Sequence, residues 1–291
     1  MSMDAYKKAE VLIEALPYIQ GFRNETVVVK FGGSVMESAE QMSGILVDVA
    51  FLWTCGIRPV IVHGGGKAIS RALAVAGIPT QFVQGLRVTC EKSMAVMERV
   101  IKTETNAAVV AMLREHGALA EGLFGERIFH VHRKTGKDPA TGEPLDWGFV
   151  GEPVMCDTGP VHELLQRGMV PVICPLGVGD DGHLYNINAD NAAAALAKAL
   201  RAKKLAFVSD IPGLLRDPKD PATLIHTLKV SDAPALMKDG IVGGGMLPKI
   251  QSCIDAISSG VGKVHIVDGR MPHSLLLEIF TQTGVGTEII G

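Results

Sequence analysis

Short β-branched stretches that end in glycines are the feature of this chain that most restricts its fold. Thr26–Phe31 runs into a glycine pair, and Arg58–His63 runs into the triplet Gly64–Gly66, which a helical pattern follows. Strands that alternate with helices in this way form parallel sheets covered by helices on both faces. The sequence therefore predicts an α/β protein, a three-layer αβα sandwich around a mostly parallel central sheet.

The same alternation continues along most of the chain. Strands are expected at Thr26–Phe31, Arg58–His63, Met169–Cys174, His183–Ile187, Lys204–Ser209 and Lys263–Val267, with Val285–Ile290 as an added edge strand. Helices are expected at 4–20, Glu37–Thr54, Lys67–Ala76, Glu91–His116, Val161–Arg167, Ala189–Ala202, Ser231–Lys238, Met246–Ser259 and Leu275–Phe280. Between Leu119 and Met155 the pattern changes to hairpins, in which Arg127–Arg133 and Phe149–Met155 flank a loop at Thr135–Asp146. We expect an N-terminal helical extension over residues 1–25 and one domain over 26–291, with lobes at 26–195 and 196–291.

Composition and charge exclude several classes of partner. The formal net charge is only −3 over 291 residues, with no long basic run, so no nucleic acid is expected as a partner. No apolar run approaches the length of a bilayer span, so no membrane contact is expected. The five cysteines form no C-x-x-C pair, which favours reduced thiols in a cytoplasmic protein over disulfides or a zinc site. His130 and His132 have no third ligand nearby in sequence, so no metal site is expected.

Lys30 ends a buried strand and precedes Gly32 and Gly33. An unpaired ammonium group is costly in an apolar core, so this side chain is not expected to face one. The two glycines let the backbone turn sharply and approach a ligand closely. These residues suit a phosphate site, and they equally suit a surface lysine before an ordinary loop.

Further glycine turns stand near the starts of other expected helices. Gly64–Gly66 precedes one helix and Gly243–Gly245 precedes another, with Lys249 one turn inside it. Helix N-termini bind phosphate or carboxylate oxygens, and parallel sheets bind ligands at the carboxyl ends of their strands. The turns together predict a shared crevice for an extended anionic ligand. Gly177–Gly182 matches a dinucleotide fingerprint but leads into a strand, so we interpret it as a hairpin turn.

Two polar segments add side chains that suit this crevice. Arg87 follows a glycine-led turn, and arginine is suited to bidentate capture of a carboxylate. Asn186 and Asn188 are two residues apart at strand spacing and therefore project from one face. Asn188 or Asp190 can instead cap the alanine-rich helix that follows. Both interpretations remain open from these residues alone.

These motifs, in this order, resemble those of the amino-acid kinase family. The matching segments are Lys30–Gly33, His63–Gly66, Gly85–Thr89, Asn186–Asp190 and Gly245–Lys249. The resemblance extends from about residue 26 to the C-terminus and implies that family's αβα fold. It implies catalytic roles for Lys30, Lys249 and Asp190, with the carboxylate holding both lysines in place. It also implies substrate contacts by Gly65, Gly66, Arg87, Asn186 and Asn188, and ATP contacts by Gly32, Gly33, Ser209, Asp210, Gly245 and Met246.

The resemblance implies phosphoryl transfer from ATP to the side-chain carboxylate of N-acetyl-L-glutamate, a step of arginine biosynthesis. Mg²⁺ would be held by the phosphates, the acceptor by the lobe at 26–195 and ATP by the lobe at 196–291. A carboxylate is ionised at neutral pH, so this reaction needs aligned anions and neutralised charge rather than a general base. A kinase of the longer homologue N-acetylaminoadipate is one alternative, and a non-catalytic partner of a PII signalling protein is another.

Residues 4–20 place apolar side chains three and four apart, which predicts an amphipathic helix before the first strand. The apolar stripe can pack on its own domain or on another subunit. Family members with such a helix resemble arginine-inhibited hexamers, so the resemblance implies feedback inhibition by arginine and a homohexamer, with PII as a further possible partner. It places the arginine site at Tyr18, Glu278, Gly284 and Gly286, with Glu278 as the partner of the guanidinium group.

Overall fold

The computed structural model describes residues 3–138, 141–243, 246–281 and 284–291. Within them, an eight-stranded sheet crosses the molecule in the order β12–β14–β13–β11–β1–β2–β8–β5. Its strands are β1 (Thr26–Phe31), β2 (Arg58–His63), β5 (Ala120–Leu123), β8 (Val170–Ile173), β11 (Lys204–Ser209), β12 (Thr227–Lys229), β13 (Lys263–Asp268) and β14 (Thr287–Ile290). Neighbouring strands pair in parallel except β13 and β14, which are antiparallel. The predicted mostly parallel sheet is therefore confirmed.

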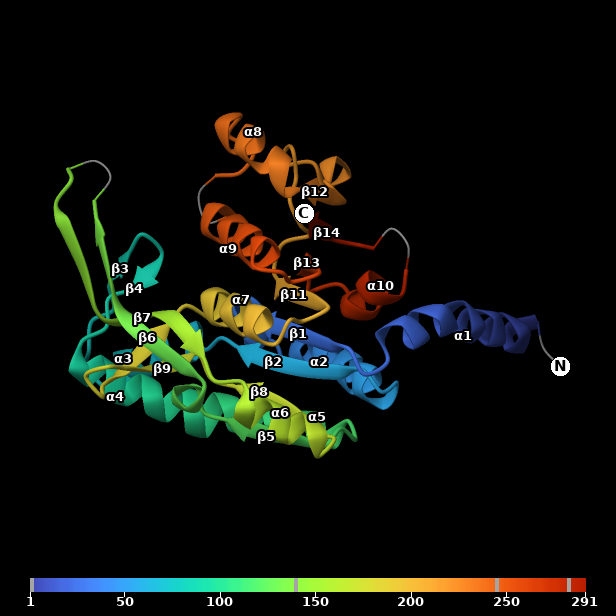
Figure 1. Cartoon of the computed structure of the whole chain (residues 1–291), viewed down its shortest axis with the longest axis horizontal. Coiled ribbons are helices and arrows are strands. Elements are labelled where there is room, and N and C mark those ends of the chain that lie inside the picture. Colours follow the sequence, from blue (N-terminus) through green and yellow to red (C-terminus); the bar gives the residue numbers. More distant parts are fainter. Residues whose placement is uncertain (1–2, 139–140, 244–245, 282–283) are drawn as a thin grey trace.

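Helices cover both faces of this sheet (Figure 1). Alternate residues of β1 point to opposite faces, so Val28 belongs to one apolar core whereas Val27 and Val29 belong to another. The first core is completed by α6 (Gly159–Gln166), α7 (Ala189–Ala199), α8 (Ala233–Lys238) and α9 (Met246–Ser258). The second is completed by α2 (Ala39–Thr54), α5 (Ala107–Glu115) and α10 (Ser274–Phe280). This arrangement confirms the three-layer αβα sandwich.

A smaller sheet stands beside the main one and closes on itself in the order β10–β7–β6–β9. Its strands are β6 (Phe129–Lys137), β7 (Pro144–Cys156), β9 (Leu176–Gly179) and β10 (Leu184–Ile187). β6 and β7 continue as a long hairpin that rises at the left of Figure 1. Near it lie α3 (Gly66–Val75), α4 (Glu91–Arg99) and the short hairpin of β3 (Phe82–Val83) and β4 (Leu86–Arg87).

The N-terminal helix, α1 (Met3–Phe22), projects from the opposite side of the molecule (Figure 1). Its presence confirms the predicted helical extension. Tyr6, Val11, Leu12 and Ile13 of this helix are between 63 % and 68 % exposed, so much of its apolar surface is accessible to solvent. In the part of the chain that the structure describes, no helix combines the length and apolar character of a membrane span.

The prediction of one continuous α-helix at Glu91–His116 is wrong for the middle of that range. α4 passes into a π-helical segment at Val100–Asn106 before α5 resumes the α-helical period. Apolar spacing does not distinguish one wider turn from the regular ones around it, which is why the pattern indicated a single helix.

The helix predicted to begin at Glu37 begins at Ala39 instead. Gly33–Glu37 forms a 3₁₀ turn, and the side chain of Ser38 caps α2 by accepting a hydrogen bond from the N–H of Gln41. The other predicted helices form with ends that differ by at most three residues. Such shifts are ordinary because helix ends fray.

The predicted loop at Thr135–Asp146 is mostly strand. Thr135 pairs with Asp146 and Lys137 pairs with Pro144, so the hairpin is longer than the sequence indicated. A Cβ on Gly136 would lie only 2.8 Å from the ring of Trp147. The glycine that suggested a loop therefore makes room for an aromatic side chain.

Three strand assignments also need correction. Ala120–Leu123, predicted to belong to the hairpin region, is the outer strand of the main sheet. The expected edge strand at Val285–Ile290 forms as β14, but β12 lies outside it. The hairpin predicted at Gly177–Gly182 forms between β9 and β10, although its first residues are strand rather than turn.

Candidate active site

Lys30 reaches the site because of its place in the pleat of β1. It follows Val28 by two residues, so both side chains project toward the layer that contains α7 and α9. Asp190 lies in the first turn of α7, and Lys249 lies in the first turn of α9. Nζ of Lys30 is 2.6 Å from Oδ1 of Asp190, and Nζ of Lys249 is 2.9 Å from Oδ2. Three distant segments therefore meet at one carboxylate.

The two ammonium groups control the ionisation of Asp190. Burial by itself raises the pKa of this carboxyl group, but the charges of Lys30 and Lys249 outweigh burial and lower the pKa to about 2. Both lysine side chains are mostly buried, at 13 % and 14 % exposed. Because one carboxylate neutralises only one of the two cations, the cluster keeps a net positive charge. That charge suits an anionic phosphoryl group.

A cavity of about 360 Å³ opens beside Lys30. Gly32 and Gly33 after β1 and Gly64–Gly66 after β2 form part of its wall. The two turns touch, because a Cβ on Gly64 would lie 3.2 Å from Cα of Gly32. α3 begins at this wall, and N–H groups at the start of a helix suit anionic oxygens.

Arg87 lies on β4 in the wall of the same cavity and is only 6 % exposed. Its Nη2 donates to the carbonyl oxygen of Gly66 at 2.9 Å and to Oγ of Ser70 at 2.8 Å, and its Nη1 donates to Oγ1 of Thr80 at 3.3 Å. The ring of Phe82 lies 4.7 Å from the guanidinium carbon. Burial lowers the pKa of Arg87. A buried guanidinium whose described partners are all neutral suits an anionic ligand.

Asn186, on β10, and Asn188 line this cavity as well. Oδ1 of Asn188 accepts hydrogen bonds from the N–H groups of Asp190 at 2.9 Å and Asn191 at 3.2 Å. Asn188 is therefore the N-cap of α7, one of the two interpretations that the sequence left open. Because the cap fixes the first turn of α7, it also fixes the backbone of Asp190.

Residues predicted to contact ATP divide into two groups. Gly32 and Gly33 line the cavity, whereas Ser209, Asp210 and Met246 lie outside its lining and Gly245 lies outside the described residues. Asp210 follows β11, and its Oδ2 accepts a hydrogen bond from Oγ of Ser34 at 2.9 Å. This bond joins the turn after β1 to the turn after β11.

Comparison with known proteins decides the family. A model of the amino acid kinase family matches residues 25–268. The chain belongs to the amino acid kinase family. Among its relatives in this family, acetylglutamate kinase from Heliobacterium modesticaldum is 45 % identical, with 99 % of each chain covered. Acetylglutamate kinase from Akkermansia muciniphila is 47 % identical, covering 98 % of this chain and 96 % of that protein.

Solved structures show the same fold. N-acetylglutamate synthase from Neisseria gonorrhoeae, complexed with coenzyme A and N-acetyl-glutamate, has a TM-score of 0.82 at 27 % identity. The match covers 100 % of this chain and 64 % of the synthase, so this chain spans just under two thirds of that protein. Carbamate kinase from Giardia lamblia bound to AMP-PNP has a TM-score of 0.63 at 19 % identity and shares the amino acid kinase fold.

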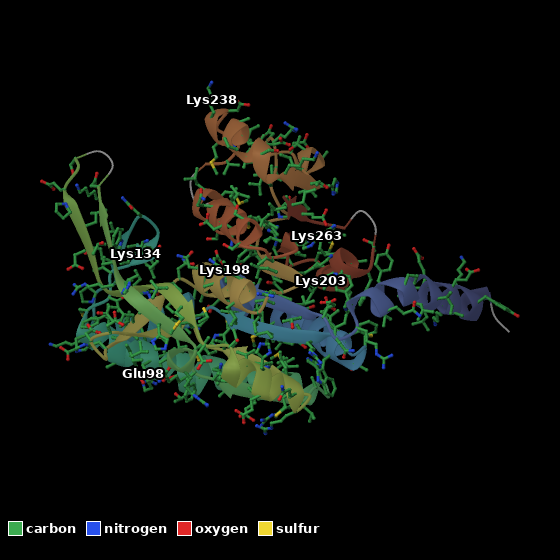
Figure 2. All side chains as sticks on the ribbon, viewed as in Figure 1. Glu98, Lys134, Lys198, Lys203, Lys238 and Lys263 are labelled. Carbon is green, nitrogen blue, oxygen red and sulfur yellow. The ribbon has the colours of Figure 1, made fainter. Side chains whose placement is uncertain are left out.

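A second, larger cavity of about 960 Å³ lies next to α1 in this family member. Tyr18 of α1, Glu278 of α10 and Gly284 line it, so three of the four residues predicted to bind arginine meet there. Lys203 and Lys263, both labelled in Figure 2, line it as well. A cavity with cationic and anionic groups suits a ligand that carries both charges.

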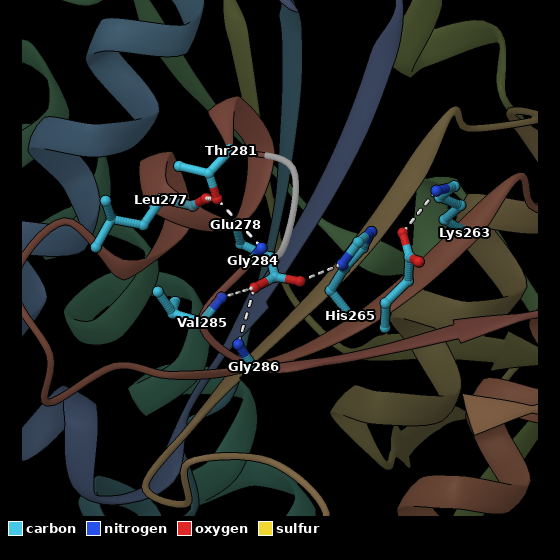
Figure 3. Close-up of polar contacts among 9 residues, drawn as sticks. Lys263, His265, Leu277, Glu278, Thr281, Gly284, Val285 and Gly286 are labelled. Atoms are coloured by element: carbon cyan, nitrogen blue, oxygen red, sulfur yellow. Dashed lines mark hydrogen bonds and ion pairs between the residues drawn. The ribbon is translucent and has the colours of Figure 1, made fainter. Parts of the chain in front are cut away.

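Glu278 already has partners inside its own chain (Figure 3). Its Oε1 lies 2.6 Å from Nδ1 of His265, and its Oε2 accepts the N–H groups of Val285 at 2.7 Å and Gly286 at 2.9 Å. Gly286, the fourth predicted residue, thus contacts the carboxylate. Each carboxylate oxygen has two lone pairs, so these bonds leave acceptor capacity for a guanidinium group.

Sequence reasoning missed two buried residues beside the glycine turn after β2. His63 is fully buried, and its ring contacts the carbonyl oxygen of Gly64 and the side chain of Asn106. His63 begins the His63–Gly66 segment, but the segment gave no role to its side chain. Asn106 lies in the π-helical segment, which the apolar pattern did not reveal.

Proposed function

We propose that the protein transfers the γ-phosphoryl group of ATP to the side-chain carboxylate of N-acetyl-L-glutamate, giving N-acetylglutamyl 5-phosphate and ADP. The observation that carries the proposal is the cluster of Lys30, Asp190 and Lys249 beside a cavity lined by glycine turns and Arg87. Relatives that are 45 % and 47 % identical over nearly the full chain bear the name acetylglutamate kinase, which supports the same acceptor.

In this proposal, the two lysines neutralise charge on the phosphoryl group as it moves between two anions. Both ammonium groups contact Asp190, so their positions are set before the substrates bind, and no reorganisation is needed during the reaction. The acceptor carboxylate is already ionised at neutral pH, so no general base is required. N–H groups of the glycine turns supply further hydrogen bonds to the phosphoryl oxygens.

The two substrates would approach this cluster from different lobes. Arg87 and Asn186 line the cavity on the side of residues 26–195, where Arg87 would capture the carboxylate that does not react. ATP would bind on the side of residues 196–291, next to Ser209 and Met246, with Mg²⁺ held by its phosphates. Phosphoryl transfer would then occur at Lys30 and Lys249, where the two sides meet.

An ADP-release assay tests the proposal directly. Purified protein is given MgATP with N-acetyl-L-glutamate, glutamate, aspartate or N-acetylaminoadipate, and hydroxylamine traps any acyl phosphate as a hydroxamate. We expect release of ADP and hydroxamate with N-acetyl-L-glutamate and much slower release with the others. Faster turnover of N-acetylaminoadipate would show that this longer homologue is the acceptor instead. No turnover of any of the four acceptors would refute the proposed activity.

Feedback inhibition by arginine is part of the same proposal. The supporting observations are the mixed charges around the larger cavity and the meeting there of Tyr18, Glu278 and Gly284. The exposed apolar side chains of α1 support assembly through this helix into a homohexamer.

The five cysteines are free thiols, which supports a cytoplasmic location. Contact with a PII protein stays a prediction.

A further inference from the structure

The ring of His63 is held in a single orientation at the end of β2. Its Nδ1 lies 2.7 Å from the carbonyl oxygen of Gly64, and its Nε2 lies 3.0 Å from Nδ2 of Asn106. The same Nδ2 donates to the carbonyl oxygen of Val172, on β8, at 2.8 Å. Carbonyl oxygens only accept, so Asn106 presents its NH₂ group to the ring and Nδ1 of His63 carries the ring proton. His63 is therefore a neutral ring that donates to Gly64.

Asn106 is itself fixed by the elements around it. It is 3 % exposed at the end of the π-helical segment. A Cβ on Gly122, in β5, would lie 2.2 Å from Oδ1 of Asn106, so this close approach requires glycine. Ile101 and Thr105 of the same segment lie 3.5 and 3.8 Å from the position that a Cβ on Gly65 would occupy. The π-helical segment thus packs directly against the glycine turn, and such segments are frequent at functional sites.

We propose that His63 is a positioning residue that aims the N–H of Gly65 at the anion bound in the cavity beside Lys30. A trans peptide unit directs its C=O and its N–H to opposite sides, and no cis peptide bond occurs in the described residues. The buried ring holds the carbonyl oxygen of Gly64, so the N–H of Gly65 faces away from the ring, toward the cavity that Gly65 lines. Among the described residues, no backbone oxygen accepts this N–H.

Glycine on both sides of this peptide unit leaves its orientation to the hydrogen bonds around it. The N–H of Gly64 donates to the carbonyl oxygen of Phe31 at 2.8 Å, and the carbonyl oxygen of Gly65 accepts from the N–H of Ile69 at 2.9 Å. Between these two anchors, neither glycine has a side chain that restricts the dihedrals beside the shared peptide unit, so a partner that holds its carbonyl adds a restraint. The hydrogen bond from His63 supplies that restraint. The inference rests on the proposed function, in which the glycine turn contacts the acceptor and the phosphoryl group.

Two substitutions of His63 separate its two hydrogen bonds. The side-chain nitrogen of asparagine can take the place of Nδ1, whereas glutamine reaches the place of Nε2. His63→Asn therefore keeps the donor to Gly64, and His63→Gln keeps only the contact with Asn106. We expect His63→Gln to lower kcat/KM for N-acetyl-L-glutamate about 10²-fold, as removal of one oxyanion donor does. His63→Asn should retain most of kcat/KM, and KM for ATP should change little in either variant.

The Gly65 amide provides a readout that does not depend on turnover. In ¹⁵N–¹H spectra, inorganic phosphate should shift this resonance in the wild type and in His63→Asn but not in His63→Gln. Equal kinetic losses in the two variants, or equal phosphate shifts, would overturn the role of His63, and melting temperatures identify any variant that fails to fold. A third outcome is a wild type without kinase activity in which phosphate still shifts the Gly65 resonance, as it does in His63→Asn but not in His63→Gln. That result would refute the proposed function and leave the positioning role of His63 intact.

Discussion

At the scale of single residues, the shared carboxylate of Asp190 determines what a lysine substitution does. In Lys30→Ala or Lys249→Ala, the remaining lysine still pairs with Asp190, so no buried charge is left without a partner and the fold should persist. We expect kcat to fall about 10²–10³-fold, the loss that follows removal of one electrostatic donor. Steady-state ADP release measures this, with KM for both substrates changing far less.

Lys198→Ala is the matched control for these lysine substitutions. Lys198 is exposed near the end of α7, the helix that carries Asp190, and lies outside the lining of the cavity beside Lys30 (Figure 2). Its kcat should equal that of the wild type. A Lys30→Ala or Lys249→Ala enzyme with kcat close to the control would contradict the role of the two charges.

His63 makes the stability of the protein depend on pH. Burial lowers the pKa of His63 to about 4, and the bond to Gly64 offsets only part of that effect. Between pH 6.5 and about 4 the unfolded chain binds a proton that the folded chain refuses, so the free energy of unfolding falls as pH falls. The loss from this residue should reach about 3 kcal/mol at pH 4. Urea unfolding across this range measures it.

Comparison with His63→Asn isolates this contribution from other titrating groups. The variant has no ionisable group at position 63, so its free energy of unfolding should fall less between pH 6.5 and 4. Parallel pH profiles for the two proteins would show that the ring is not held neutral.

At the scale of secondary-structure elements, α1 offers a direct test of assembly. Ile13 is 68 % exposed, and a carboxylate placed there would have to be buried if α1 packs on another subunit. We expect Ile13→Glu to reduce the hexamer in sedimentation velocity and to weaken inhibition by arginine. Gln20→Glu, which adds the same charge at an exposed polar position of α1, should change neither property. A fully hexameric Ile13→Glu protein would rule out assembly through this face.

A buried carboxylate of α2 contacts the residue that precedes α10. Asp48 is 1 % exposed, and its Oδ1 lies 2.7 Å from Nδ1 of His273. We expect Asp48→Ala to lower the free energy of unfolding by about 2 kcal/mol, as the loss of a hydrogen bond to a charged group does. His273→Ala leaves the buried carboxylate of Asp48 without this partner and should lower the free energy of unfolding by more. Denaturant titration of both variants checks this order.

Helices and strands with a regular pattern of apolar residues could be predicted from the sequence. Elements whose form depends on contacts between residues distant in the chain could not. β1 and β2 are continuous apolar runs next to glycines, so their bounds were predicted without error. The π-helical segment is one irregular turn inside a long apolar pattern. The hairpin of β6 and β7 contains Gly136, which leaves room for the ring of Trp147, and the sequence does not reveal that contact.

At the scale of the whole molecule, the same distinction separates two parts of the candidate site. Lys30 and Arg87 could be identified because each is a charged side chain next to glycines in an apolar setting. The joining of Lys30 to Lys249 through Asp190 was implied by the family resemblance and not by spacing along the chain, because it depends on α7 and α9 packing over one face of β1. His63 and Asn106 contact each other across layers, and no spacing along the chain records such a contact.

The order of strands in the sheet also sets the order in which a growing chain can complete it. β1 is synthesised first but lies between β2 and β11. Its pairing with β2, and the addition of β8 and β5, require only residues up to Ile173. Until β11 leaves the ribosome, the other side of β1 is an open strand edge of the kind that chaperones protect from aggregation. Lys30 and Lys249 meet at Asp190 only after that edge has been closed, so the cluster that we propose as the catalytic centre is one of the last parts of the molecule to form.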